Sequence, residues 1–232
     1  MNSRFSDSAQ IGTVASFSEL VATDFVGVRN ALCWNRKLEG DFKEVVSQLQ
    51  LQEDITEVSV EDLMALELSE QGLVARAFIL NDLQLLTDFG AAPVLNLLKC
   101  YERDAAFDFI STDVYSFHVD RSPVATDTFL CTYHGVASDL IANDEARQNI
   151  LIPEIREQLL ALHDGPESEF EAFLTEHYFD LHYQALPNAT PIDCGVGHLW
   201  RLAVDHPTQQ VPPCIHRAPV EVAGEFRLLL IC

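Results

Sequence analysis

Val114-Tyr115-Ser116-Phe117-His118-Val119-Asp120 alternates apolar and polar side chains, with Tyr115, Phe117 and Val119 on one face. An alternation of period two is typical of a β-strand that buries one face. The other face carries His118 and Asp120. The stretch therefore predicts a strand that packs its apolar face on a core and lines a cavity with its polar face.

Further strands are expected on the C-terminal side of this stretch. A second strand is predicted over residues 128–134, ending at Gly135. Strand character returns in residues 197–204, 213–219 and 225–232, where Gly and Pro punctuate short apolar runs. Short strands with this punctuation favour an antiparallel barrel or sandwich of the jelly-roll or cupin type.

The N-terminal part of the chain is expected to be mainly helical. Asp41 and Ser59 are good N-caps for two helices, and a third helix is predicted from about residue 73 to 89, ended by Gly90. Pro93 is expected to start a fourth helix. The predicted fold class is α+β. A helical support region (residues 1–104) packs on a C-terminal barrel (residues 105–232), and the 232 residues form a single domain.

An acidic insertion interrupts the predicted barrel at about residues 139–182. It contains eleven acidic and two basic residues and is expected to be helical. Its charge is typical of a solvated surface, and the alternatives are a docking face for a protein partner or a lid over the site. His177 and His182 also lie in this segment. On a helix, residues five apart do not share a face well, so no second metal cluster is expected there.

Three residues form a candidate mononuclear metal site. His118 and Asp120 lie two apart on one strand, so both side chains point to the same side, and His216 follows on a later extended segment. Two imidazoles and one carboxylate leave three positions open on an ion, which suits iron(II) chemistry with a chelating co-substrate and dioxygen. Arg227 shares a face with inward apolar residues and needs an anion. That anion is either the carboxylate of a co-substrate such as 2-oxoglutarate or a protein carboxylate.

The C-terminal half resembles the double-stranded β-helix of the iron(II)- and 2-oxoglutarate-dependent oxygenases, especially their prolyl-hydroxylase-like branch. Residues 117–120, 128–133 and 216–220 and Arg227 follow that family's order. The whole chain is also similar to an uncharacterised bacterial family of unknown function, marked by its Phe-His-Val-Asp and Cys-Ile-His-Arg-Ala-Pro segments.

This resemblance implies a hydroxylase-type oxygenase of unknown substrate with iron(II) and 2-oxoglutarate as cofactors. It implies that His118, Asp120 and His216 bind the iron and that Arg227 binds the distal carboxylate of 2-oxoglutarate. It also implies that Tyr133 or Thr132 adds a hydroxyl to the co-substrate, although only one of these neighbours can point inward. No catalytic residue beyond the metal ligands is identified.

Two other functions remain open from the sequence. Cys214 is expected to face the same way as His216, and a thiolate added to the three ligands would favour a closed zinc site. The chain would then be a zinc-binding or metal-homeostasis protein. A cupin-like metal enzyme that does not use 2-oxoglutarate is the third candidate, because this kind of barrel hosts several chemistries.

Composition restricts partners and location. With 14 basic and 36 acidic residues the formal charge is −22, which disfavours binding to nucleic acid or to an anionic membrane surface. The first twenty residues lack the charged leader and apolar run of a signal peptide, and no apolar run reaches membrane-spanning length. Six scattered cysteines without a C-x-x-C pair are expected to be reduced, so a cytoplasmic location is expected.

Overall fold

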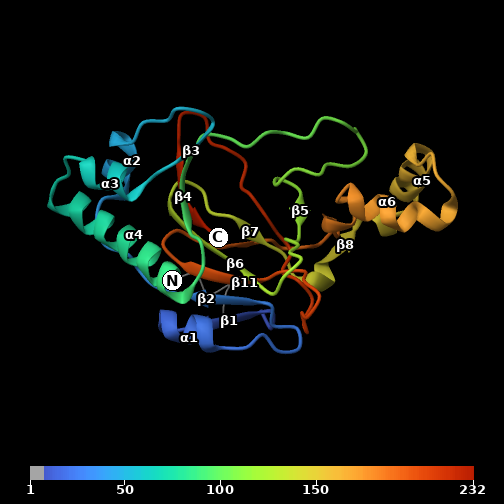
Figure 1. Cartoon of the computed structure of the whole chain (residues 1–232), viewed down its shortest axis with the longest axis horizontal. Helices are drawn as coiled ribbons and strands as arrows, with labels where there is room; N and C mark the ends of the chain where they lie inside the picture. The colour runs from blue at the N-terminus through green and yellow to red at the C-terminus, as the bar shows by residue number, and fades with distance from the viewer. Residues whose placement is uncertain (1–7) are drawn as a thin grey trace.

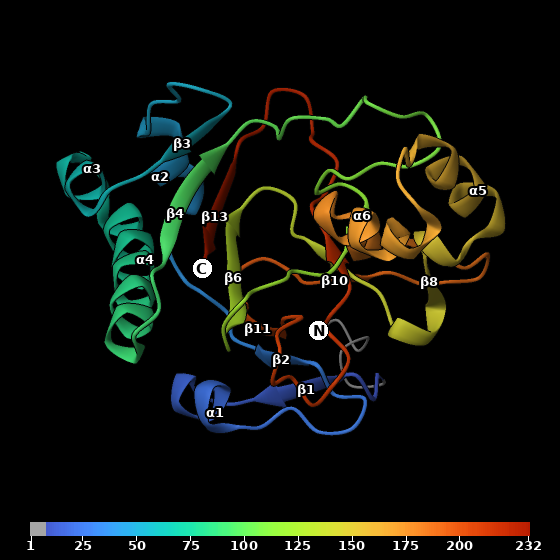
Figure 2. The ribbon, with the colours of Figure 1, turned by 45° about the vertical axis from the view of Figure 1, so that its right-hand side comes forward.

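The computed structural model describes residues 8–232 and shows an α+β protein built around two sheets that face each other (Figures 1 and 2). The larger sheet has seven strands in the order β1-β2-β11-β6-β13-β4-β3. It is mixed, because β1 pairs in parallel with β2 while its other pairings are antiparallel. Its strands are β1 (Ile11–Val14), β2 (Ala31–Trp34), β3 (Ile55–Glu57), β4 (Val94–Leu98), β6 (Asp127–His134), β11 (Leu199–Ala203) and β13 (Arg227–Ile231).

The smaller sheet is an antiparallel half-barrel of six short strands in the order β10-β7-β12-β5-β9-β8. Its strands are β5 (Phe117–His118), β7 (Asp139–Leu140), β8 (Ala146–Gln148), β9 (His182–Ala185), β10 (Ile192–Asp193) and β12 (His216–Arg217). From β4 to β7 and again from β11 to β13, the chain crosses from one sheet to the other at each successive strand.

Four α-helices lie between residue 8 and β4, and α2, α3 and α4 flank the large sheet (Figure 1). They are α1 (Phe17–Ala22), α2 (Phe42–Gln48), α3 (Val60–Ala65) and α4 (Glu70–Phe89). The predicted caps are confirmed: Asp41 accepts a hydrogen bond from the Glu44 amide, and Ser59 accepts one from the Asp62 amide. Gly90 ends α4 in the left-handed conformation, with φ 96°.

A separate lobe on the other side of the half-barrel contains α5 (Pro153–Leu162) and α6 (Phe170–Glu176) (Figure 2). The predicted insertion is therefore helical only in part, because β7 and β8 also lie within it. The lobe has its own small apolar cluster, which includes Ile150, Leu159 and Phe170. In the described residues no helix is long and apolar enough to cross a membrane.

Alternate side chains of strand β6 pack on opposite faces of the large sheet. In β6, Phe129, Cys131 and Tyr133 join the core between the large sheet and the N-terminal helices. Leu130 belongs instead to the cluster between the two sheets. Because side chains alternate along a strand, Thr132 also faces the space between the sheets.

The N-terminal half is mixed α/β, so the prediction of a mainly helical support region is wrong. The leucine-rich segment after Pro93 forms strand β4 rather than a helix, because it pairs with β13 on one side and β3 on the other. The apolar residues 31–34 likewise form β2. Short apolar runs do not distinguish a buried strand from a helix, and the partners that decide lie far away in sequence.

The decisive strand is also shorter than expected. Only Phe117 and His118 form β5, because the Asp113 carboxylate accepts hydrogen bonds from the Tyr115 and Ser116 amides and holds residues 113–116 in a turn. The predicted alternation nevertheless holds. Phe117 and Val119 pack in one apolar cluster, which does not include Tyr115, whereas His118 and Asp120 line a cleft that Val119 also borders.

Candidate metal centre

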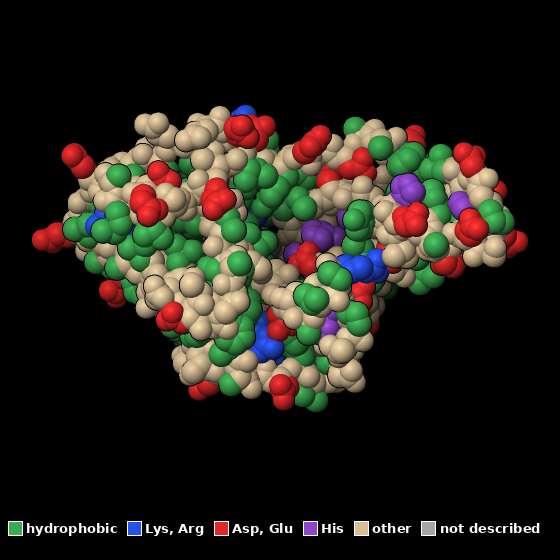
Figure 3. All heavy atoms as spheres, viewed as in Figure 1, with side chains coloured by type: hydrophobic (Ala, Val, Ile, Leu, Met, Phe, Trp, Pro, Cys, Tyr) green, Lys and Arg blue, Asp and Glu red, His purple; other side chains and the backbone are tan. Residues whose placement is uncertain are grey.

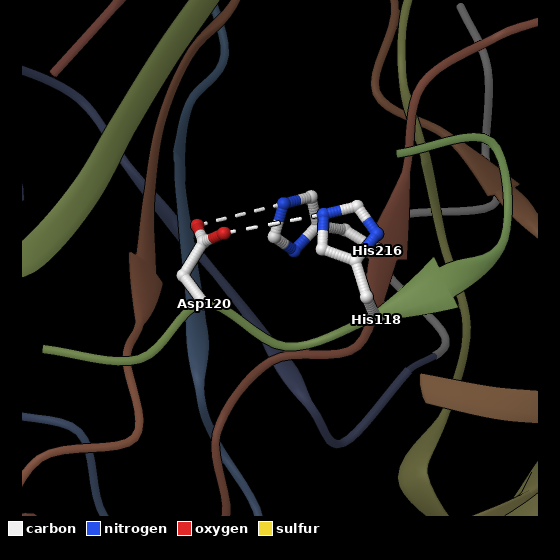
Figure 4. Close-up of side chains that lie close together, drawn as sticks. All are labelled: His118, Asp120 and His216. Carbon is white, nitrogen blue, oxygen red and sulfur yellow. Dashed lines mark ion pairs between the residues drawn. The ribbon is translucent and has the colours of Figure 1, made fainter. Parts of the chain in front are cut away.

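His118, Asp120 and His216 come together at one end of the space between the sheets (Figure 4). His118 on β5 pairs directly with His216 on β12, and Asp120 follows two residues after His118. One ligand atom from each of the three residues lies within 4.8 Å of the others. The predicted His-x-Asp…His arrangement is therefore a group that could hold one metal ion.

Hydrogen bonds orient both imidazoles toward the carboxylate. His118 Nδ1 lies 2.8 Å from the Ser116 carbonyl oxygen, and His216 Nδ1 lies 3.3 Å from the Cys214 carbonyl oxygen. A carbonyl oxygen only accepts, so in each ring Nδ1 carries a proton, and the neutral form of each ring has a bare Nε2 that can bind a metal. His118 Nε2 is 3.9 Å from Asp120 Oδ1, and His216 Nε2 is 3.5 Å from Asp120 Oδ2.

These separations fit the donor set of a small divalent ion. Ligands about 2.1 Å from one ion and roughly at right or tetrahedral angles lie roughly 3.0–3.4 Å apart, so the three ligand atoms, which lie within 4.8 Å of one another, would move closer together to complete the site. The protonation states fit as well. Burial and then the neighbouring His216 lower the pKa of His118 to about 4, so its ring is neutral at pH 7.

Thr128 on β6 orients the carboxylate of the group. Its hydroxyl donates to Asp120 Oδ2 at 2.5 Å. Burial opposes ionisation of Asp120, but His216 and the hydrogen bond from Thr128 outweigh it and lower the pKa of the carboxyl. The lowered pKa favours the carboxylate form of Asp120, whose Oδ2 accepts from Thr128 and whose Oδ1 lies 3.9 Å from His118 Nε2. The sequence analysis missed Thr128, because only the pairing of distant segments brings it beside Asp120.

A cleft of about 770 Å³ opens at the group. Its lining includes His118, Asp120, Arg121, Tyr178 and His182, and it runs between the main body and the insertion lobe. Figure 3 shows histidine and acidic side chains at the bottom of a hollow in this region. His118 and Asp120 are therefore accessible from the cleft, whereas His216 is buried behind them and is not part of the lining.

Arg227 is 8 % exposed and faces the space between the sheets. Its guanidinium donates to the Thr132 hydroxyl at 2.9 Å and to the Ser138 hydroxyl at 2.9 Å. In residues 8–232 it pairs with no carboxylate, and burial lowers the pKa of Arg227. A protein carboxylate, the alternative left open by the sequence, is therefore not its partner in the described chain.

The structure separates the two candidate hydroxyl residues. Thr132 lies beside Arg227 on the inner face of β6. Tyr133 points the other way, where its hydroxyl donates to Asp82 at 2.7 Å in the core under α4. Asp82 is also paired with Arg36. Of the two hydroxyls, only that of Thr132 contacts Arg227.

Cys214 is not part of the metal group. Its side chain is 1 % exposed and packs in the apolar cluster between the sheets with Ala31 and Trp200. Burial raises the pKa of the Cys214 thiol well above its usual range, and the charge of Asp120 raises it further. The thiolate form that binds zinc is therefore disfavoured in the metal-free protein.

His182 is a second residue that the sequence analysis did not place. The segment is not helical at this point, because His182 begins β9 and pairs directly with His118. Its Nδ1 lies 2.6 Å from the Ser116 hydroxyl, and its ring lines the cleft. Burial lowers the pKa of His182 to about 4, so this ring is also neutral at pH 7.

Comparison with known proteins gives no relative. The chain matches no protein-family model, no curated protein and no solved structure.

Proposed function

We propose that the protein is a mononuclear, non-haem iron(II) oxygenase that uses 2-oxoglutarate and acts on a substrate bound in the cleft. The observation that carries this proposal is the group of His118, Asp120 and His216. Two imidazoles and one carboxylate with open positions are the donor set of such iron enzymes. A protein that only stores zinc would instead need a closed shell of four ligands.

The path of the chain supports the same function. Strands β4 to β7 and β11 to β13 pass alternately between the two sheets, an alternation that a double-stranded β-helix also has, whereas β8, β9 and β10 stay in the smaller sheet. The metal group lies on the inner face of its smaller sheet. Fold alone does not fix chemistry, so the proposal depends on the residues inside.

Arg227 supports the choice of co-substrate. A buried guanidinium without an anionic partner has a strong preference for a carboxylate, which it binds through two parallel hydrogen bonds. Thr132 and Ser138 hold the Arg227 side chain on the inner face, and the Thr132 hydroxyl can add a hydrogen bond to the same anion. 2-Oxoglutarate carries a distal carboxylate for this site and a chelating end for the metal.

In this proposal the chain's own residues bind the metal, orient the co-substrate and exclude water. When bound, iron(II) and 2-oxoglutarate supply the oxidising chemistry. His118 and His216 present bare Nε2 atoms, and Thr128 holds Asp120 in its ionised form. The apolar residues between the sheets, such as Leu229 and Trp200, keep water away from Arg227 and strengthen its attraction for an anion.

The test is an anaerobic titration of the metal-free protein with iron(II) and then with 2-oxoglutarate, following the visible charge-transfer band of the chelated complex. The band is expected in the wild type. Arg227→Met keeps the length of the side chain and should leave iron affinity unchanged but weaken 2-oxoglutarate binding by about 30-fold or more, the cost of removing one partner of a buried charge pair. Arg103→Met, at an exposed ion pair with Glu221, is the matched control and should change neither.

The other outcomes identify the alternatives. Iron binding without a band would favour a cupin-like metal enzyme that does not use 2-oxoglutarate. An unchanged 2-oxoglutarate affinity in Arg227→Met would remove the role of Arg227. Tight zinc retention that depends on Cys214 would favour a metal-homeostasis protein.

A further inference from the structure

Three histidines form a row across the half-barrel. His216 on β12 pairs with His118 on β5, and His118 pairs with His182 on β9. Residues directly opposite in neighbouring strands point to the same face, so all three rings lie on the inner side. The ring centroids are 4.5 Å apart for His118 and His216 and 5.9 Å apart for His118 and His182. His182 lies outside the metal group, one strand away from it.

Hydrogen bonds fix where the His182 ring carries its proton. The Ser116 hydroxyl donates to the Asp113 carbonyl oxygen at 2.8 Å, and a hydroxyl has only one proton to donate. Both contacts of the hydroxyl can form at once only if the Ser116 oxygen accepts from His182 Nδ1, 2.6 Å away, and we assign the ring on that basis. The neutral ring then has its proton on Nδ1 and a lone pair on Nε2.

That lone pair is open to the cleft. Within residues 8–232, His182 Nε2 makes no hydrogen bond, since the only polar contact of the ring is the one to Ser116. His182 Nε2 is also absent from the fully buried polar atoms that lack a partner in residues 8–232, so this atom is exposed to solvent at least in part. Because the ring lines the cleft beside His118, Nε2 is a free acceptor next to the metal group.

The charges near His182 favour a cation. The carboxylates of Asp113, Asp104 and Asp180 all act on its ring. Arg121, the basic side chain of the cleft lining, pairs with both Asp180 and Asp205, so it offsets one of these two carboxylates and the charge around the ring remains negative. A positively charged group that can donate a hydrogen bond suits both the acceptor atom, His182 Nε2, and the negative charge around it.

We propose that His182 is a substrate-binding residue whose Nε2 accepts a hydrogen bond from an ammonium or guanidinium group of the substrate. This inference takes from the proposed function only that the substrate binds in the cleft beside the metal. Neighbouring strands are about 4.8 Å apart, so the cation would be held within a few bonds of the carbon that faces the metal. The substrate class is therefore a small amine or guanidine, or a side chain that carries one.

The test reads the His182 ring directly by long-range ¹H–¹⁵N NMR of the ¹⁵N-histidine-labelled full chain loaded with zinc, a diamagnetic occupant of the metal group. His182→Gln assigns the signals. The spectrum should show a protonated Nδ1 and a bare Nε2. Methylammonium or methylguanidinium should shift the Nε2 signal saturably, whereas tetramethylammonium, a cation without a donor, and acetate should not.

Two variants and one control make the test specific. His182→Phe keeps an aromatic ring and should weaken methylguanidinium binding, followed by the backbone amides of residues 178–181, by about tenfold or more. Ser116→Ala removes the acceptor for Nδ1 and should raise the population of the ring form protonated on Nε2. His163→Gln, in the insertion lobe, should change nothing.

A wild-type ring protonated on Nε2, an equal shift with tetramethylammonium, or binding that survives His182→Phe would overturn the inference. The measurement uses neither iron nor 2-oxoglutarate. A missing charge-transfer band would thus count against the proposed function but not against cation binding at His182. A failure of cation binding at His182 would likewise leave the proposed function untouched.

Discussion

The substitution Thr128→Val tests how the protein prepares Asp120 for a metal. Valine has nearly the same shape as threonine but lacks the hydroxyl that donates to Asp120 Oδ2 at 2.5 Å. Asp120 would then lose one of the three influences that lower its pKa, leaving those of His216 and His118, while burial would continue to raise it. The carboxyl should become harder to ionise and freer to rotate.

The magnitude follows from the type of hydrogen bond. A hydrogen bond to a charged group contributes about 1.5–3 kcal/mol, which corresponds to a loss of roughly 10- to 150-fold in metal affinity. The same range is expected for a residue that orients a metal ligand without touching the metal. Because the pKa of Asp120 rises, the loss should be larger at pH 5 than at pH 7.5.

Competition between the protein and a coloured chelator for zinc or iron(II) measures this affinity, and thermal unfolding of the metal-free protein controls for a change in stability. Thr208→Val, in the loop after His206, is the matched control and should leave the affinity unchanged. An affinity of Thr128→Val within twofold of the wild type at both pH values would refute the role of the hydroxyl.

Three further outcomes are expected. The metal-free protein should lose stability as the pH falls from about 6.5 to 4, because His118 and His182 have pKa values of about 4 in the folded state and take up protons more readily when unfolded. In urea unfolding, His182→Phe should remove up to roughly 3 kcal/mol of this loss. A variant that loses as much stability as the wild type would contradict the role of His182. Asp82→Asn leaves the buried Arg36 without its charged partner and should lower the free energy of unfolding by about 3–5 kcal/mol. The control Asp54→Asn, at the exposed ion pair with Lys99, should lower it by about 1 kcal/mol or less. Equal effects of the two substitutions in urea unfolding would refute the reasoning. Cys214→Ser should leave zinc affinity unchanged by chelator competition, and a large loss would return Cys214 to the ligand set.

Local signals in the sequence predicted those parts of the fold that local interactions determine. The N-caps Asp41 and Ser59 and the end of α4 at Gly90 depend on hydrogen bonds within a few residues, so the sequence is sufficient to place them. Strand β4 depends on pairing with β13, more than a hundred residues away. Its leucines are equally compatible with a helix until that partner is known.

In the candidate site, too, the residues that could be predicted are those placed by local geometry, and the others depend on contacts between distant segments. His118 and Asp120 could be paired from their spacing, because a strand places alternate side chains on one face. Thr128 and His182 could not be found, because each acts through a contact that forms only when separate strands meet. The inward direction of Thr132 rather than Tyr133 also needed the register of β6 between its two neighbours.

The strands that supply the metal ligands are among the shortest in the molecule. β5 and β12 have two residues each and share few backbone hydrogen bonds, so by themselves they form a weak junction. An ion bound by His118 and His216 would cross-link them and close a loop of about a hundred residues that contains the whole insertion lobe. Metal binding would then stabilise this junction: as the ion's concentration rises above its dissociation constant, separating β5 from β12 costs more free energy, and the cross-link adds to the pairing of β9 with β5 that already joins the end of the lobe to the half-barrel.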